Sequence, residues 1–254
     1  MSSPIWTPAA LSSEFRAVSG AWWRLVEAQH QVSTMKLVDT VEEQSLLEGL
    51  LEETKPALPP ECAGLDYLLA TPFRYGAVYP NGSRFRRAGR TLGVFYAAER
   101  VTTALAEMAF YRLLFFAESP ETPLPANAAE YTAFSAPVTT TRALDLTAPP
   151  LARDAAAWED PVSYEACQAL ADAARAADGQ AILYRSVRDP QRGMNIALLS
   201  ALAFAAREPV ERQTWHIRLG RAGVQALCEF PQRRLGFSVT DFASDPRLSR
   251  FRSG

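Results

Sequence analysis

The chain has 254 residues, enough for one large domain or one domain with a substantial extension. Its formal net charge of −2 gives no general attraction to nucleic acid or to an anionic membrane. Three widely separated cysteines and two histidines form no zinc-binding pattern. No apolar run approaches the roughly 18–20 residues that cross a membrane, and the N-terminus does not resemble a signal peptide. We therefore expect a cytoplasmic protein with no metal and with no membrane or direct nucleic-acid partner.

Residues 1–64 are predicted to form a helical extension. The spacing of aromatic and apolar side chains predicts a first helix over residues 22–32. Thr40 and Glu43 match a capping box, in which each side chain accepts a hydrogen bond from the backbone N–H of the other residue. Leucines at helical spacing follow, and prolines from Pro56 onward end this second helix.

From residue 65 the pattern changes to strands and helices without a regular β-α-β rhythm, which predicts an α+β domain over residues 65–254. Residues 92–96 have strand composition, and a helix is predicted from Thr102 or Thr103 to Ala117. The other predicted elements are strands at 131–135, 138–146, 180–187, 197–205 (ambiguous with helix) and 213–219, a turn at 192–195, and a helix at 163–177 that ends in a glycine cap at Gly179.

Two arginines are candidates for binding a phosphate. Arg74 directly precedes Tyr75, and Arg84 lies in a cluster of arginines at residues 83–87. A guanidinium group presents a planar fork that matches phosphate oxygens. The alternative for each arginine is an ordinary surface ion pair.

The remaining candidates are two tyrosines, a glutamate and a serine. Tyr75 and Tyr96 could stack on a planar ring such as nicotinamide or adenine, or simply pack in the core. Glu107 has apolar neighbours in its helix. A carboxylate beside an apolar cleft can bind ribose hydroxyls and stabilise the positive charge that develops as a glycosidic bond opens, although helical periodicity could instead turn Glu107 to solvent. Ser186 could bind a phosphate or ribose, or be an ordinary serine at a strand end.

Several common catalytic motifs are missing from the sequence. It contains no Walker loop, no G-x-G-x-x-G between a strand and a helix, and no G-x-S-x-G elbow. P-loop, Rossmann and α/β-hydrolase sites are therefore not supported.

Taken in order, the candidate segments resemble the RES domain, a family named for its Arg, Glu and Ser, over roughly residues 65–219. Residues 26–39 resemble the long subgroup that includes ParT-like toxins. Ser83 stands where the family often has glycine. The segments that carry the resemblance are Arg74-Tyr75, Ser83-Arg84-Phe85, Phe95-Tyr96-Ala97-Ala98-Glu99, Ala104-Leu105-Ala106-Glu107, Tyr184-Arg185-Ser186-Val187-Arg188 and Gly193-Met194-Asn195.

The resemblance implies a toxin of a type II toxin–antitoxin pair, with an ADP-ribosyltransferase-like fold in which two short sheets flank an NAD cleft. It implies NAD⁺ as co-substrate, no metal, and an Xre-like antitoxin that covers the cleft. The implied roles are diphosphate binding for Arg74 and Arg84, contact with the nicotinamide end for Tyr75 and Tyr96, contact with the ribose for Glu107, and contact with phosphate or ribose for Ser186, with Glu107, Arg74 and Tyr96 as the catalytic set.

Our leading hypothesis is that the protein cleaves NAD⁺ and transfers ADP-ribose to a cellular protein, for which the N-terminal extension could build a docking surface. One alternative is an NAD⁺ glycohydrolase or phosphorylase that depletes cellular NAD⁺. Another is a binding module without catalysis, in which the arginines hold a nucleotide or the acidic face of a partner.

Overall fold

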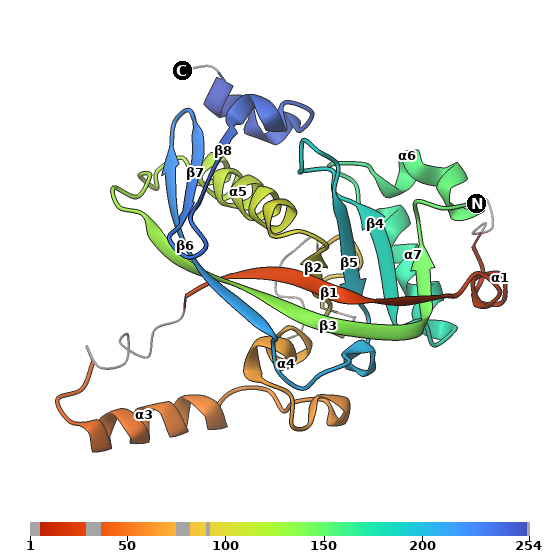
Figure 1. Ribbon diagram of the computed structural model, residues 1–254, viewed down its shortest axis with the longest axis horizontal. Helices are drawn as coiled ribbons and strands as arrows, with labels where there is room; N and C mark the ends of the chain where they lie inside the picture. The colour runs from red at the N-terminus through yellow and green to blue at the C-terminus, as the bar shows by residue number, and fades with distance from the viewer. Residues whose placement is uncertain (1–5, 29–36, 75–81, 90–91, 253–254) are drawn as a thin grey trace.

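The computed structural model describes residues 6–28, 37–74, 82–89 and 92–252. These residues form a mixed α+β structure with one eight-stranded sheet in the order β1-β2-β5-β4-β3-β6-β7-β8, in which β1 also pairs with β3 (Figure 1). The strands are β1 (Arg16–Glu27), β2 (Phe95–Ala98), β3 (Ala129–Asp145), β4 (Ala181–Arg185), β5 (Met194–Leu198), β6 (Glu211–Gly220), β7 (Gly223–Cys228) and β8 (Arg233–Ser238). The helices are α1 (Pro8–Ser12), α3 (Val41–Glu53), α4 (Tyr67–Arg74), α5 (Val101–Glu118), α6 (Ala155–Trp158) and α7 (Glu165–Ala176).

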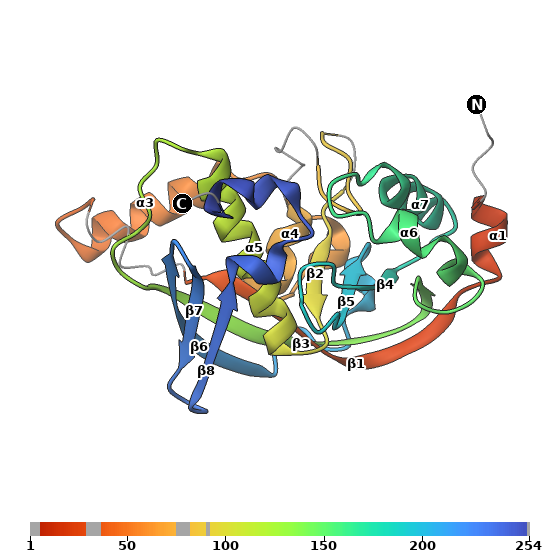
Figure 2. The same cartoon turned by 90° about the horizontal axis from the view of Figure 1, so that it is seen from above.

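Two long strands, β1 and β3, form an antiparallel ribbon that runs through the whole molecule (Figure 2). The other edge of β3 is divided between two partners. Residues 129–135 pair with β6, whereas residues 143–145 pair in parallel with β4. Strands β6, β7 and β8 therefore gather at one end of the ribbon, and β4, β5 and β2 gather at the other end.

The expectation of two separate short sheets is therefore corrected, because the ribbon joins both groups of strands into one hydrogen-bonded sheet. The two strands predicted at 131–135 and 138–146 are a single strand that continues through Pro137. Proline lacks the N–H that a central strand position donates. Pro137 lies where β3 changes partner from β6 to β4, so a donor on that edge is not needed there.

The helix predicted over residues 22–32 is wrong for the residues that the structure describes, because residues 22–27 belong to strand β1. Side chains of β1 pack on both faces of the sheet. Trp22 joins the core on one face, while Leu25, with Trp23 against it, joins the core on the other. This segment of the sequence therefore lacks the apolar–polar alternation that is typical of a strand with one face exposed to solvent. The boundary between residues 64 and 65 stays a prediction, although β1 pairs with strands beyond it.

The capping box at the start of α3 is confirmed. Thr40 Oγ1 accepts a hydrogen bond from Glu43 N at 3.1 Å, and Glu43 Oε2 accepts one from Thr40 N at 3.2 Å. The long helix predicted after Thr102 or Thr103 is confirmed as α5. Both predictions rested on local signals, a cap and an uninterrupted helical run.

Other predictions were close but displaced. The strand expected at 92–96 is β2, and α7 ends in a Schellman motif with Asp178, not Gly179, in the left-handed conformation at φ 56°. The turn expected at 192–195 overlaps the start of β5. The strand expected at 197–205 is wrong beyond residue 198, because Ala201–Ala203 form a 3-10 helix, and β7 and β8 were not predicted.

Helix α5 lies between the two groups of strands (Figures 1 and 2). Its buried side chains pack in one core with residues of β1, β3, β6 and β7, whereas α4 packs on a second core with β2, β3 and β5. Within the described ranges, we find no helix with both the length and the apolar character needed to cross a membrane. The position of α5 matters for function because it carries Glu107 towards β4 and β5.

Phe95 of β2 should be essential to the second core. It is fully buried and contacts the rings of Phe134, on the ribbon, and Phe204 at centroid distances of 6.3 and 5.0 Å. We expect Phe95→Ala to lower the free energy of unfolding by about 3–5 kcal/mol in urea denaturation. Phe230→Ala, at a side chain that is 85% exposed, should change it by less than about 0.5 kcal/mol. Equal losses for the two variants would contradict this packing.

Candidate functional site

Glu107 is the centre of the candidate site. Its Oε1 atom accepts hydrogen bonds from Ser186 Oγ and from Asn195 Nδ2, both at 2.7 Å. Its Oε2 atom has no hydrogen-bond partner among the residues that the structure describes. The helix side chain is thus fixed through one oxygen, and the other oxygen remains available to a ligand.

The two donors come from the hairpin of β4 and β5. Tyr184 lies opposite Asn195 in this antiparallel pair, and Ser186 N donates to Gly193 O at 2.8 Å just beyond the last strand residue. Side chains two residues apart on a strand share a face. Tyr184, Ser186 and Asn195 therefore project from the same side of the hairpin, towards α5.

The loop between these strands is fixed by a buried aspartate. Asp189 Oδ2 accepts from Thr103 Oγ1 at 2.7 Å and from Gly193 N at 3.2 Å. A Cβ atom at Gly193 would lie 2.2 Å from Thr103 Oγ1, so only glycine fits there without displacement. The contact with Thr103 ties the loop to the first turn of α5, the helix that carries Glu107.

Ser186 uses its whole hydrogen-bonding capacity within the protein. Its hydroxyl donates to Glu107 and accepts from Arg188 N at 3.2 Å and Asp189 N at 2.9 Å. A hydroxyl has one hydrogen and two lone pairs, and all are occupied. The arrangement makes Ser186 a residue that positions Glu107, and the direct contact with phosphate or ribose stays a prediction.

Two tyrosines, Tyr111 and Tyr184, lie close enough to Glu107 for its charge to affect their pKa values. Burial raises the pKa of Tyr184 well above its ordinary value, and the nearby Glu107 charge acts in the same direction. Desolvation of the phenol likewise raises the pKa of Tyr111, whose side chain is 47% exposed, with further contributions from Tyr164 and Glu107. These two phenols are neutral at physiological pH, so they can donate hydrogen bonds or pack on a ring near Glu107 without adding negative charge.

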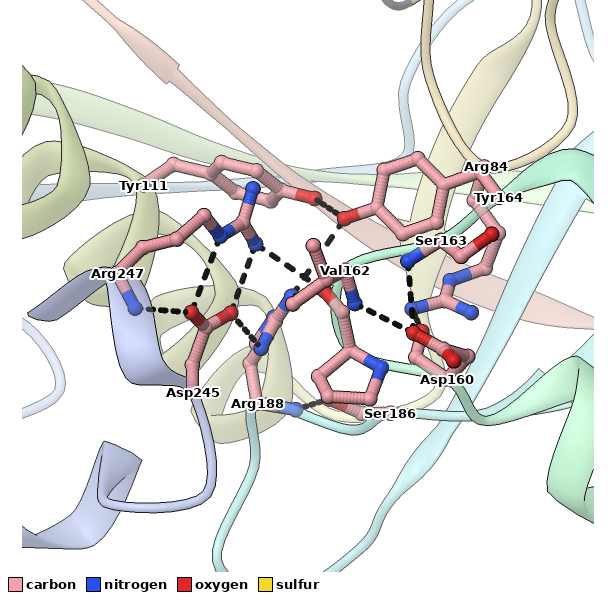
Figure 3. Close-up of polar contacts among 11 residues, drawn as sticks. Arg84, Tyr111, Asp160, Val162, Ser163, Tyr164, Ser186, Arg188, Asp245 and Arg247 are labelled. Atoms are coloured by element: carbon pink, nitrogen blue, oxygen red, sulfur yellow. Dashed lines mark hydrogen bonds and ion pairs between the residues drawn. The ribbon is translucent and has the colours of Figure 1, made fainter.

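Arg84 is buried, and among the described residues its guanidinium group makes no direct contact with a carboxylate. Its guanidinium donates to Trp158 O at 2.6 Å and to Asp160 O at 3.0 Å. It also lies 4.7 Å from the ring centre of Tyr164, and Figure 3 shows Arg84 beside Tyr164 and Asp160. It therefore holds the loop before α7. Diphosphate binding by Arg84 stays a prediction. A phosphate would have to bind while Arg84 keeps its two hydrogen bonds to carbonyls and its contact with Tyr164, or it would have to displace them.

Tyr96 holds the turn that carries Arg84. Its hydroxyl lies 2.8 Å from Ser83 Oγ and accepts from Phe85 N at 3.0 Å. Burial raises the pKa of Tyr96 above its ordinary value. On β2 it pairs with Ala197 of β5, the strand that also supplies Asn195. The structure thus brings Tyr96 to the same hairpin as Glu107's two donors.

Arg74 is not joined to Glu107 or Ser186 by a contact among the described residues. It ends α4 and donates through Nη1 to Glu52 Oε1 of α3 at 2.5 Å. This matches the alternative of an ion pair, but Glu52 is more than half exposed, so the partner is replaceable. Tyr75 lies outside the described residues.

Sequence reasoning missed Asn195 as a site residue, although the Gly193-Met194-Asn195 segment had been singled out. It also missed a buried ion cluster (Figure 3). Arg188 Nη1 and Arg247 Nη2 both donate to Asp245 Oδ2 at 2.7 Å, and the Arg188 guanidinium lies 3.8 Å from the centre of the Phe110 ring.

The ion cluster joins three parts of the chain. The Pro161 carbonyl oxygen accepts hydrogen bonds from Arg188 and from Arg247, the latter at 3.1 Å, so the C-terminal segment is tied to the loop before α7. In the same loop, the Asp160 carboxylate accepts from Ser163 N and Val162 N, and these bonds lower the pKa of Asp160. The charges of Arg84 and Arg188 contribute to this lowering.

No group of three or more His, Cys, Asp or Glu side chains that could hold a metal occurs in the described ranges. The chemistry available from the described side chains is thus a fixed carboxylate, neutral phenols and guanidinium groups. This set can bind a sugar hydroxyl, stabilise a cationic sugar and attract phosphate.

Comparison with known proteins shows the family. The model of the RES domain matches residues 58–220, which is more than half of the chain, and the chain belongs to the RES domain family. Among curated proteins, none matches the sequence. A chain in the crystal structure of the M. tuberculosis MbcT–MbcA toxin–antitoxin complex is similar over 96% of this chain and 94% of that chain, with 13% identity and a TM-score of 0.46, a likeness too weak to carry function across.

Asp245 provides a pH-dependent test of the ion cluster. Burial alone would raise its pKa, but hydrogen bonds from Arg247 and the charges of Arg188 and Arg247 outweigh burial and lower it. A depressed pKa contributes stability above the unfolded value of about 3.9 and loses it as the pH falls through the folded value. Asp245→Asn should cost about 3–5 kcal/mol of unfolding free energy at neutral pH, since Arg188 loses its buried counter-charge.

The difference between wild type and Asp245→Asn should stay constant above about pH 5 and shrink below about pH 4 in urea denaturation series. Asp178→Asn is the matched control, because Asp178 is 92% exposed and Asn also tolerates its left-handed backbone. A deficit in Asp245→Asn that does not change with pH would contradict a charged Asp245.

Proposed function

We propose that the protein is a cytoplasmic toxin of a type II toxin–antitoxin system that cleaves NAD⁺ and transfers ADP-ribose to a cellular protein. Membership of the RES domain family supports a toxin that acts on NAD⁺ and an Xre-like antitoxin as partner. The observation that carries the proposal is the Glu107 carboxylate, fixed by Ser186 and Asn195 through Oε1 with Oε2 open to a ligand.

The reaction that this carboxylate suits is rupture of an N-glycosidic bond. The bond between the ribose C1′ and the nicotinamide nitrogen breaks, its electron pair passes to the nicotinamide, and positive charge develops on the ribose. A carboxylate that already lies in place stabilises this charge without reorganising in the transition state. A nucleophile of the acceptor protein then forms a bond to C1′ and loses its proton.

Within this proposal, the arginines have different roles. Arg84 donates to two backbone carbonyls, so it would shape the loop beside the substrate and add positive charge. Arg74 has an exposed ion-pair partner, which a phosphate could replace at little cost. We therefore assign Arg74 as the chief diphosphate ligand, with Tyr75 and Tyr96 near the nicotinamide end and Ser186 as the residue that orients Glu107.

Glu107→Gln tests the catalytic role. The amide keeps the shape of the side chain and an oxygen for Ser186 and Asn195, but it removes the charge. With NAD⁺ labelled in its adenylate phosphate and a cell lysate as acceptor source, wild type should label a protein band. The variant should label it on the order of 10²–10³-fold more slowly.

Glu118→Gln is the matched control, because Glu118 is an exposed residue at the end of the same helix. Its labelling rate should equal that of wild type. Free ADP-ribose alone would point to hydrolysis, and phosphorylated ADP-ribose would point to phosphorolysis, so either would defeat the transfer proposal. Growth arrest by Glu107→Gln at the wild-type level would defeat catalysis altogether and favour a binding module.

Asn195→Ala tests the positioning of Glu107. The variant frees the carboxylate to leave its fixed orientation while Ser186 still binds it. A small misplacement of a catalytic group can lower the rate on the order of 10²-fold. We expect kcat for NAD⁺ cleavage to fall by about that amount with little change in KM, and a selective rise in KM would instead place Asn195 in substrate binding.

A further inference from the structure

Helix α3 presents an apolar face that no other described element covers. None of its residues is buried, and Figure 1 shows it standing away from the sheet. Among the described residues, an ion pair joins its C-terminal end to the body of the protein, where Glu52 pairs with Arg74 of α4. Leu46 and Leu50, one helical turn apart, are 65% and 52% exposed.

These leucines form a continuous stripe with their neighbours. Leu46, Leu47, Leu50 and Leu51 follow the spacing that places residues on one face of a helix. Leu37, before the helix, joins three of them in lining a shallow hollow. A helix of 13 residues, about 20 Å long, is marginal when it does not pack on a partner. Covering the stripe would therefore stabilise α3.

The charges beside the stripe decide what can cover it. Helix α3 contains five glutamates and neither lysine nor arginine. Glu42 and Glu53 lie one turn from Leu46 and Leu50 on one side of the stripe, and Glu48 borders the other side. Glu52 lies further round the helix, where it pairs with Lys55 and Arg74. Within the described residues, Glu42 and Glu53 have no ion-pair partner.

This charge pattern disfavours three kinds of occupant. A second copy of α3 would bring two sets of glutamates together, and like charges across an interface are repulsive. Nucleic acids and anionic membranes are repelled for the same reason. We infer that α3 is a docking site for a protein helix that carries an apolar stripe flanked by lysine or arginine. This inference does not depend on the NAD⁺ chemistry proposed above.

The experiment uses the full chain and two designed helical peptides with the same leucine stripe, one flanked by lysines and one by glutamates. We expect the lysine peptide to bind at least about 10-fold more tightly in fluorescence anisotropy, with a preference that falls as salt is added. Glu42→Lys combined with Glu53→Lys should reverse the preference.

Leu46→Glu combined with Leu50→Glu should weaken binding of the lysine peptide at least about 10-fold. Leu202→Glu is the matched control, because Leu202 is also 65% exposed but lies outside α3, and it should bind as wild type does. Circular dichroism of each variant checks that the fold is retained.

Three results would overturn the inference. They are no binding of the lysine peptide, equal binding of both peptides, and a wild-type dimer in sedimentation that Leu46→Glu with Leu50→Glu dissociates. The last result would assign the stripe to a second copy of the chain.

Discussion

One oxygen atom, Glu107 Oε1, joins the three elements on which the candidate site depends. It receives hydrogen bonds from the end of β4 and from β5, and it belongs to α5. Because a carboxylate only accepts, the Asn195 amide must turn its nitrogen towards Glu107. Its Oδ1 is then buried without a partner among the described residues, an arrangement that costs stability in an ordinary core. A buried amide with an unpaired oxygen is explained better by a role of Asn195 in the site than by a role in packing.

The rest of the fold keeps that atom in place. The β1–β3 ribbon carries both groups of strands, and α5 lies between them, so the helix is packed along its length while Glu107 faces the β4–β5 hairpin. Asp189 links the hairpin loop to the start of α5 through Thr103, and the Arg188–Asp245 pair links it to the C-terminal segment. A carboxylate held this way needs little reorganisation when charge develops nearby, which is the property that electrostatic catalysis requires.

The sequence predicted the parts of the structure that have local signals. The capping box before α3 and the apolar run of α5 needed no distant contact to be recognised. Strand β1 was mistaken for a helix because it buries side chains on both faces, whereas β7, with Val224, Ala226 and Cys228 buried in alternation, carried a readable pattern that was missed. The division of one long strand between two partners depends on pairings across the sheet and could not be read locally.

The candidate site was predicted in part for the same reason. Glu107 and Ser186 were named from the residues and from the RES resemblance, and the structure brings them into contact. Asn195 was quoted as part of a motif but given no role. Nothing in the sequence connects Arg188 with Asp245, 57 residues further on, because two charges that meet only through folding leave no local periodicity.

The most direct test of the central claim is a crystal structure of the Glu107→Gln protein with NAD⁺ bound. The account predicts the nicotinamide ribose within hydrogen-bond distance of the substituted side chain, with the diphosphate near Arg74. NAD⁺ bound elsewhere on the protein, with its ribose away from Ser186 and Asn195, would contradict it.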